Sequence, residues 1–425
     1  MKSFLAFPPA RELRGSLRVP SSKSATNRAL LLAALSETPV RIERPLESED
    51  TRALLACLTA MGARAVRHPD ALSVSGPLAG SDAAATVLDA RDSGTAARFL
   101  IGAAAATRGR FRVIGSARLS QRPMGELAAA LRLLGAEVVE EGAPGCLPLA
   151  IRGGRLSGGP VSVDSSRSSQ FVSALLLAGA AGGRIEVSAA GTVASRPYVA
   201  MTLESLRAFG HRVEGAGPWR VERGARSPDR YETPGDYSSA VPLLSGVGIC
   251  GGEVRLTGLR WPTADADALA LPILGAMGME ISAEASEISA RAARGGLRPV
   301  SASMTGCPDA VPAVAAAAAF APGRSRLEGV AHLRWKESDR LDALSSLLRC
   351  GGAAANADAD GLTIDGGGID SAAGLAVLPT AKDHRIAMAA GLLSLVRRRA
   401  LIENPDCVSK SYPEFFRDLA ALSRR

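Results

Sequence analysis

A motif that ends in glycine recurs five times along this chain, at intervals of about 70 residues. In each copy a leucine, two variable residues and one apolar residue precede the glycine. Apolar residues before each glycine follow helical spacing, which predicts amphipathic helices that end at a C-terminal glycine cap. The predicted caps are Gly62, Gly135, Gly210, Gly278 and Gly351. A sixth helix at 415–422 keeps the period.

A second type of helix recurs out of phase with the first and is apolar nearly all round, which predicts that it is buried. Its six copies begin near Ser24, Gly94, Ser169, Ser238, Asp309 and His384. Short polar residues at these starts are typical N-caps, so capping alone is one explanation of them. Helices and strands that alternate at this period predict six copies of an α/β unit.

The sixth copy lacks its trailing strands, whereas residues 3–19 are strand-like and precede the first buried helix. We expect residues 3–19 to complete the sixth unit, which places both termini in one domain. With three units in each domain, the chain divides into a discontinuous domain of 1–19 plus 236–425 and an inserted domain of 20–235. Pro234-Gly235 suits the second crossing.

The composition is that of a folded protein. The chain has 425 residues, of which 47% are hydrophobic and 22% charged, so disorder is excluded as its main state. No apolar stretch reaches the ~18 residues of a transmembrane helix, and the first residues contain too short an apolar run for a secretory signal. Six scattered cysteines without a CxxC pair, and only four histidines, argue against a zinc site. We expect a cytoplasmic protein with reduced thiols.

The net charge of +8 indicates an anionic partner, which could be nucleic acid, a membrane surface or a phosphorylated small molecule. An arginine-rich composition without functional meaning is the alternative. Aromatic residues make up only 4% of the chain, which argues against single-stranded nucleic acid because such ligands stack on aromatic side chains.

A basic residue precedes each of the six amphipathic helices, although a helix N-terminus is already positive. Repeated violation of a local rule points to function, and cations beside helix N-termini make strong anion sites. We expect about half of these residues to be merely exposed, above all Arg44 and Arg260. The six are Arg44, Arg122, Arg196, Arg260, Arg334 with Lys336, and Lys410.

Two basic motifs are denser than the others. Residues 23–28 place Lys23, Ser24 and Arg28 within about one helical turn. Residues 336–340 place two cations and two carboxylates at a predicted helix start, where Lys336 and Arg340 share a face. A surface ladder of ion pairs is the alternative reading of this second motif.

The chain resembles the 5-enolpyruvylshikimate-3-phosphate synthase family in motifs that run in family order over nearly its whole length. The matching segments are 22–24 with 27–35, 93–96 with Arg98, 122–125, 168–171, 195–198, 308–310, 336–341, 383–388 and 410–413. The resemblance implies an α/β (α+β) fold of two similar domains, each with three βαβαββ units around buried helices. It also implies an active site in the cleft between the domains.

The family transfers the enolpyruvyl group of phosphoenolpyruvate to the 5-hydroxyl of shikimate 3-phosphate and releases phosphate, on the shikimate pathway to chorismate and the aromatic amino acids. The resemblance implies no metal, no organic cofactor and a monomer that acts on two small anions, with no nucleic acid or membrane involved. By resemblance, shikimate 3-phosphate contacts Lys23, Ser24, Arg28, Ser168, Ser169, Gln170, Ser195, Asp309, His332 and Lys336. Phosphoenolpyruvate contacts Lys23, Gly94, Arg122, Gln170, Arg340, Arg385 and Lys410.

The implied chemistry is addition followed by elimination. By resemblance Glu337 donates a proton to C3 of the enol, Asp309 accepts the hydroxyl proton, and Lys23 lies at the junction of the two substrates. Glu337 must be protonated at some stage, either through a raised pKa or through a proton that the substrate supplies. The alternatives are that Asp309 is only an N-cap and that Glu337 is only a surface ion pair.

The chain departs from the family pattern at three positions: His332 replaces the usual asparagine, Phe99 stands where proline or leucine is common, and Asp92 replaces asparagine. The family is the target of glyphosate, which occupies the phosphoenolpyruvate site, and a side chain at Gly94 would crowd it.

Two other functions are possible, one a related enzyme activity and the other a non-catalytic binding role. The sister family, UDP-N-acetylglucosamine enolpyruvyl transferase, carries a cysteine where this chain has Ala117. The sister family also lacks the Ser-Ser-Gln phosphate cradle that this chain has at 168–170. A non-catalytic, basic nucleic-acid-binding protein would bind with steep salt dependence. That reading does not explain carboxylates placed between the cations.

Overall fold

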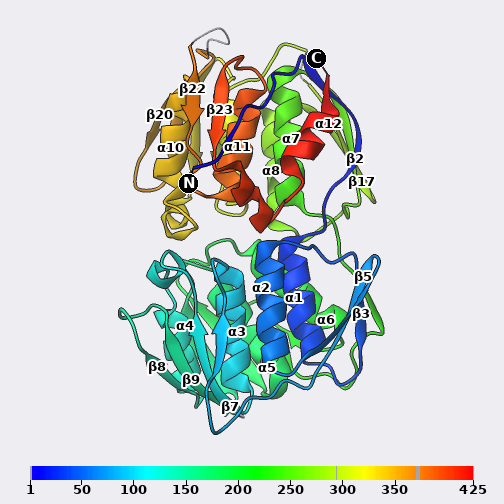
Figure 1. Ribbon diagram of the computed structural model, residues 1–425, viewed down its shortest axis with the longest axis vertical. Helices are drawn as coiled ribbons and strands as arrows, with labels where there is room; N and C mark the ends of the chain where they lie inside the picture. Colours follow the sequence, from blue (N-terminus) through cyan, green and yellow to red (C-terminus); the bar gives the residue numbers. More distant parts are fainter. Residues whose placement is uncertain (1, 155, 293, 370–373, 425) are drawn as a thin grey trace. The chain divides into compact units, whose positions relative to one another are not determined.

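The computed structural model describes residues 2–154, 156–292, 294–369 and 374–424 (Figure 1). The chain divides into two compact units, called unit 1 (Met1–Pro20 with Pro234–Arg425) and unit 2 (Ser21–Thr233). The chain therefore leaves unit 1 after Pro20 and returns at Pro234, close to the crossings predicted at 19–20 and 235–236.

Unit 2 contains three four-stranded sheets of one topology, in which a parallel pair is followed by two antiparallel neighbours. The first sheet has the order β14 (Arg230–Glu232), β3 (Val40–Glu43), β5 (Ala71–Ser75) and β4 (Arg64–His68). The second has the order β6 (Thr86–Asp89), β7 (Gly109–Ile114), β9 (Leu149–Gly153) and β8 (Glu137–Glu140). The third has the order β10 (Gly159–Asp164), β11 (Ile185–Ala190), β13 (Trp219–Glu222) and β12 (Arg212–Glu214).

Among the described residues, the sheets of unit 1 have five, four and three strands, and each again contains one parallel pair with antiparallel neighbours. One sheet has the order β16 (Glu280–Glu284), β17 (Glu287–Arg291), β15 (Gly252–Thr257), β2 (Glu12–Arg18) and β24 (Ser423–Arg424). The next has the order β18 (Ser301–Ser303), β19 (Gly323–Glu328), β21 (Leu362–Gly366) and β20 (Ala354–Ala357). The last has the order β1 (Phe4–Leu5), β23 (Ala400–Glu403) and β22 (Ala376–Leu378).

The prediction that residues 3–19 complete the sixth unit is half right. Strand β1 pairs antiparallel with β23 of the sixth unit, but β2 pairs parallel with β15 and so opens the fourth unit. Strand β14 does the same in unit 2, where it pairs parallel with β3 of the first unit. A parallel partner need not be close in sequence, and these distant strands fasten each unit's two chain ends together.

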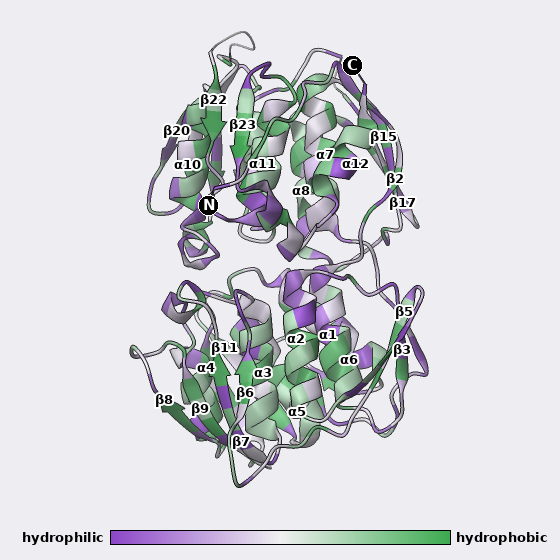
Figure 2. Ribbon diagram, in the orientation of Figure 1, coloured by the Kyte–Doolittle hydropathy of each residue, from purple (hydrophilic) through white to green (hydrophobic). Residues whose placement is uncertain are grey.

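Six buried helices form the interior of the two units. They are α1 (Lys23–Ala34), α3 (Gly94–Ala106), α5 (Gln170–Gly182), α7 (Tyr237–Cys250), α9 (Val311–Ala318) and α11 (His384–Ser394). Nearly every residue of each is buried. Figure 2 colours α3 and α5 largely green and white, and these two helices pack against each other. The predicted buried helices are confirmed.

The first five amphipathic helices end at glycines, as predicted, with one correction. They are α2 (Glu49–Ala60), α4 (Gly125–Leu133), α6 (Pro197–Ala208), α8 (Ala270–Ala276) and α10 (Arg340–Gly351). The sixth, α12 (Phe415–Leu422), has Ser423 as its C-cap. Gly62, Gly135, Gly210 and Gly278 have positive φ, the conformation that glycine adopts without strain. In the fifth unit Gly351 is still helical and the next residue, Gly352 with φ 98°, is the cap.

The predicted α/β class is confirmed by these sheets and helices. Four short 3-10 helices precede amphipathic helices or follow strands: η1 (Leu119–Gln121), η2 (Ala266–Leu269), η3 (Ala331–Trp335) and η4 (Pro405–Lys410). Within the described residues, every helix is too short or too polar to span a membrane.

Candidate active site

One arginine in unit 1 gathers three carboxylates. Arg340 is the first residue of α10, and its side chain is 1% exposed. Its Nη1 donates to Asp309 Oδ1 at 2.7 Å, its Nη2 to Glu337 Oε2 at 2.7 Å, and its Nε to Asp383 Oδ2 at 2.8 Å. Burial disfavours a charged guanidinium, but Asp383, Glu337 and Asp309 hold the pKa of Arg340 well above its ordinary value. The Arg340 guanidinium is therefore permanently charged.

Other cations reach the same carboxylates from different elements. Lys336 Nζ lies 3.9 Å and Arg385 Nη2 lies 3.8 Å from Asp309, while Lys410 Nζ lies 3.5 Å from Glu337. The structure thus brings together the two predicted proton-transfer carboxylates and the four predicted cations of unit 1. In the described part of the chain, no group of three or more His, Cys, Asp or Glu side chains is placed to hold a metal ion.

These contacts contradict three alternative interpretations, in which the residues have only a structural role. Asp309 is not an N-cap, because α9 begins at Val311 and its N-cap is Ala310. Glu337 is not a surface ion pair, because its side chain is only 12% exposed. Lys336 and Arg340 form no surface ladder, since Lys336 precedes the helix in an extended conformation and Arg340 is buried.

Asp383 is a member of this cluster that sequence reasoning missed as a site residue. Its side chain is fully buried, caps α11 by accepting from Arg385 N at 2.9 Å, and accepts from Arg340 on its other oxygen. Arg385 in turn donates to the Ser238 carbonyl oxygen at 2.7 Å. An N-cap signal was visible at residue 383, but nothing local indicated a partner on α10.

His332 lies in η3 and is 8% exposed. Burial, with Lys336 and Arg340 nearby, lowers the pKa of His332 to about 4, although Asp309 opposes the shift. The imidazole is therefore neutral near pH 7 and can donate or accept a hydrogen bond, as the usual asparagine would.

In unit 2, the start of α1 places Lys23, Ser24 and Arg28 together, as predicted. Lys23 is 8% exposed, and its Nζ lies 3.2 Å from Asp50 Oδ2. Arg28 is buried; its Nη1 donates to the Ser24 carbonyl at 2.9 Å and its Nε to Thr202 Oγ1 at 2.8 Å. Its guanidinium also lies 5.3 Å from the centre of the Phe99 ring, which gives this departure from the family pattern a packing role.

The residues predicted to bind a phosphate lie at the start of α5. Ser168 Oγ accepts from Gln170 N at 3.2 Å, and the adjoining Ser169 is 4% exposed. Ser195 lies just before α6 and has φ 57°, a conformation that costs a serine about 1–3 kcal/mol. Strain of this kind is found where a side chain must be aimed at a ligand.

Gly94 is the first residue of α3, and a Cβ built on it would lie 2.6 Å from Cζ of Arg122. Arg122 precedes α4 and is 5% exposed. Only glycine lets this guanidinium approach the N-terminus of α3, where backbone N–H groups already favour an anion.

The remaining basic residues at helix starts are more exposed, as expected. The Arg44 side chain is 40% exposed and pairs with Glu232. Arg196 and Arg260 are exposed, and Arg196 donates to the Ala216 carbonyl at 2.9 Å. Of the basic residues predicted at these helix starts, Arg122 and Lys410 are buried, whereas Arg334 and Lys336 are half-buried.

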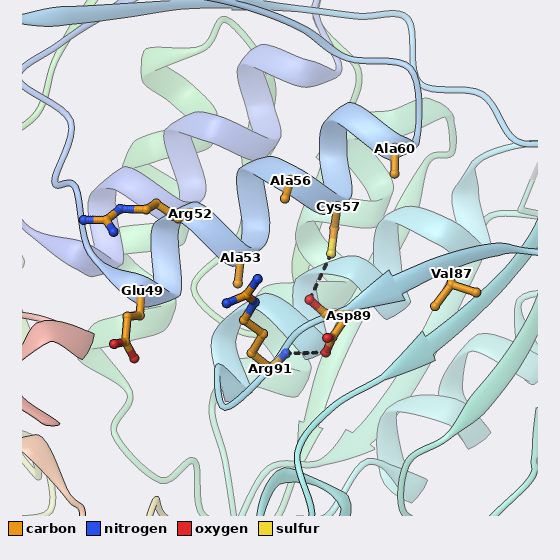
Figure 3. A pocket seen from close by; sticks show the side chains of 9 residues that line it. All are labelled: Glu49, Arg52, Ala53, Ala56, Cys57, Ala60, Val87, Asp89 and Arg91. Atoms are coloured by element: carbon orange, nitrogen blue, oxygen red, sulfur yellow. Dashed lines mark hydrogen bonds between the residues drawn. The ribbon is translucent and has the colours of Figure 1, made fainter.

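A cavity of about 400 Å³ in unit 2 lies apart from the predicted residues (Figure 3). Its lining comes from α2, β6 and Arg91, and none of it belongs to the predicted site. Cys57 on this wall donates from Sγ to the Asp89 carbonyl at 3.3 Å, and burial raises the pKa of Cys57 to about 12. This thiol is protonated near pH 7, so it does not stand in for the sister family's cysteine.

The fold and the two sets of buried cations define the enolpyruvyl transferase class. A solved EPSP synthase from Acinetobacter baumannii superposes with TM-score 0.81 at 27% identity, covering 100% of this chain and 98% of that one. The enolpyruvyl transferase NikO from Streptomyces tendae shares the fold, with TM-score 0.80 at 22% identity and 99% and 97% coverage.

Sequence comparison narrows the class. The model of the family EPSP synthase (3-phosphoshikimate 1-carboxyvinyltransferase) matches residues 8–419. A 3-phosphoshikimate 1-carboxyvinyltransferase from Methanoculleus marisnigri is 38% identical, with 94% of each chain covered. One from Burkholderia ambifaria is 36% identical, with 99% of each covered. The chain belongs to the EPSP synthase family.

Proposed function

We propose that this chain transfers the enolpyruvyl group of phosphoenolpyruvate to the 5-hydroxyl of shikimate 3-phosphate and releases phosphate. The observation that carries the proposal is the Arg340 cluster, which holds Asp309 and Glu337 on one buried guanidinium. An anion-binding protein without turnover needs no carboxylates among its cations. The family match supports the same activity.

Unit 2 supplies most of the groups proposed to bind shikimate 3-phosphate. Hydroxyls of Ser168 and Ser169 lie at the start of α5, where the helix dipole favours a phosphate. Lys23, Ser24 and Arg28 offer further donors from α1, and Ser195 lies before α6. From unit 1, Asp309, His332 and Lys336 complete the proposed set of ligands.

Phosphoenolpyruvate carries a carboxylate and a phosphate, and guanidinium groups bind both through paired hydrogen bonds. In unit 2 we assign this role to Arg122 beside Gly94, with Gln170 and Lys23. In unit 1 we assign it to Arg340, Arg385 and Lys410, each at most 6% exposed. Buried cations bind anions strongly because little water screens them.

The reaction proceeds through a tetrahedral intermediate. In the addition step the 5-oxygen forms a bond to C2 of phosphoenolpyruvate, its proton passes to Asp309, and C3 receives a proton from Glu337. In the elimination step the bond from C2 to the phosphate oxygen breaks, the proton held by Asp309 passes to the leaving phosphate, and C3 returns its proton to Glu337. Arg340 Nη2 at 2.7 Å and Lys410 Nζ at 3.5 Å stabilise the carboxylate form of Glu337. The proton that Glu337 donates to C3 is therefore brought in by the substrate.

The remaining assignments belong to the same proposal. Units 1 and 2 are the two domains, and the protein acts as a cytoplasmic monomer on two small molecules, without nucleic acid or membrane. Glyphosate competes with phosphoenolpyruvate for the residues assigned to phosphoenolpyruvate binding.

A phosphate-release assay tests the function. Purified protein is incubated with phosphoenolpyruvate and either shikimate 3-phosphate or UDP-N-acetylglucosamine. We expect release with shikimate 3-phosphate alone. Release only with the sugar nucleotide would assign the sister activity, and no release from folded protein with either acceptor would reject the proposal.

A further inference from the structure

Arg98 is a buried cation that none of the roles above uses. It lies on α3 and is 2% exposed. Its Nη1 donates to Gln170 Oε1 at 2.8 Å and more weakly to the Gly94 carbonyl at 3.4 Å, and its Nη2 donates to the Pro123 carbonyl at 2.9 Å. The guanidinium also lies 5.2 Å from the centre of the Phe171 ring. Burial of a charge is costly unless the charge is paired or hydrogen-bonded, and these hydrogen bonds offset that cost for Arg98.

The three acceptors belong to three segments of unit 2. Gly94 begins α3, Pro123 follows Arg122 ahead of α4, and Gln170 begins α5. Each segment carries one of the groups that we assign to phosphoenolpyruvate. One planar guanidinium therefore links two backbone carbonyls, of Gly94 and Pro123, to the side-chain amide of Gln170.

Arg98 also decides which way the amide of Gln170 points. A guanidinium can only donate, so the amide oxygen must face Arg98. The amide nitrogen then faces α3, where it donates to Thr95 Oγ1 at 3.0 Å. An amide nitrogen carries two N–H groups, and an amide turned this way presents the second as a donor to an anion.

We propose that Arg98 is a positioning residue, which orients the Gln170 amide and the backbone beside Arg122 so that both bind phosphoenolpyruvate. The inference rests on the proposed function. Arg98 contacts no reacting atom in this scheme and acts through its neighbours. A lysine keeps the charge but cannot reach three acceptors in one plane.

The test compares steady-state kinetics of Arg98→Lys with the wild type. A misplacement of about 1 Å can cost roughly 100-fold, so we expect the KM for phosphoenolpyruvate to rise by about tenfold or more. We expect the KM for shikimate 3-phosphate to rise clearly less, because Gln170 is one of many groups proposed to bind it, whereas Arg98 holds both Gln170 and the backbone beside Arg122 for phosphoenolpyruvate. Arg397→Lys is the matched control, since Arg397 is also buried and donates to two backbone carbonyls, of Gly351 and Gly374.

A double-mutant cycle separates positioning from general loosening. If Arg98 acts through Gln170, Arg98→Lys should cost clearly less in a Gln170→Ala background than in the wild type. Phe171→Leu loosens Arg98 while keeping an apolar core residue, and it decides the matter if Arg98→Lys does not fold. We expect it to raise the KM for phosphoenolpyruvate by about threefold.

Equal rises in both KM values, full additivity with Gln170→Ala, or an unchanged KM for phosphoenolpyruvate in Phe171→Leu would each overturn the inference. An inactive wild type would reject the proposed function instead, so the two failures are distinguishable.

Discussion

The buried arginine Arg340 of unit 1 is held differently from Arg28 and Arg98 of unit 2. In unit 1, Arg340 donates to three carboxylates. In unit 2, Arg28 and Arg98 donate to hydroxyl, amide and backbone carbonyl oxygens. A neutral oxygen orients a guanidinium without cancelling its charge, whereas a carboxylate balances the charge and can also exchange protons. Under the proposed function, the same repeated fold binds anions in unit 2 and combines binding with acid–base chemistry in unit 1.

The largest expected effect is on the stability of unit 1. Arg340→Met leaves Asp309, Glu337 and Asp383 buried without their shared partner, which should lower the free energy of unfolding by about 3–5 kcal/mol. Arg28→Met in unit 2 leaves neutral acceptors without their donor, so we expect a loss of about 1–3 kcal/mol. Urea unfolding measures both.

The exposed pair of Arg324 with Asp365 is the control for that comparison. Arg324→Met should cost less than about 1 kcal/mol. Equal losses for Arg340→Met and Arg28→Met would break the distinction between the units.

The next effect concerns proton transfer. Glu337→Gln keeps the hydrogen bond from Arg340 but removes the group that exchanges a proton, so kcat should fall by about 100- to 10,000-fold. The KM for phosphoenolpyruvate should change far less. Glu328→Gln alters a half-exposed glutamate of unit 1 and should leave both constants unchanged. A kcat for Glu337→Gln within about tenfold of the wild type would remove Glu337 from the chemistry.

A pair of histidines, one in each unit, predicts a pH effect. Burial lowers the pKa of His332 in unit 1 and of His211 in unit 2 to about 4. Arg223 contributes at His211. Because the unfolded chain binds these protons near pH 6.5 and the folded chain does not, stability is lost as the pH falls from about 6.5 toward 4.

Between pH 7 and pH 5 each histidine should cost about 2 kcal/mol of unfolding free energy. His332→Gln and His211→Gln should each flatten this dependence in urea unfolding at the two pH values. If the units unfold in separate transitions, each variant should affect only its own. Variants that lose as much stability on acidification as the wild type would contradict the assignment.

The smallest effect probes the anion site of unit 2. Gly94→Ala would place its methyl group against the Arg122 guanidinium, which can move because it ends a flexible side chain. We expect inhibition by glyphosate to weaken by about tenfold and the KM for phosphoenolpyruvate to rise less, because overpacking costs about 1–3 kcal/mol. Gly275→Ala is the control, since a Cβ there meets no atom within 4 Å. Equal losses for inhibitor and substrate in steady-state kinetics would refute this expectation.

Much of the fold could be predicted because its signals are local. Helical periodicity placed the six buried helices, and glycine placed the caps to within one residue, as the shift from Gly351 to Gly352 shows. Strand pairing was less predictable. Strand β2 lies beside β15 and not in the sixth unit. Backbone hydrogen bonds form equally well between strands that are near or far apart in the sequence, so the pattern of a strand does not identify its partner.

The candidate site divides in the same way. The cations at helix starts were visible in the sequence, and buried Arg122 and Lys410 were among them. The ion pairs of Asp50 with Lys23 and of Asp383 with Arg340 could not be predicted, because nothing in the sequence around either aspartate indicates its partner. Arg98 did leave a signal, since a cation inside an apolar helix must find acceptors.

The sequence by itself determined the six-unit repeat, the helix types and the chemical character of the helix starts, because periodicity, capping and charge act over a few residues. The tertiary structure alone decided which cation meets which carboxylate, which arginines are exposed, and how the Gln170 amide is turned. Those outcomes depend on contacts between segments far apart in the chain, which only folding brings within hydrogen-bonding distance.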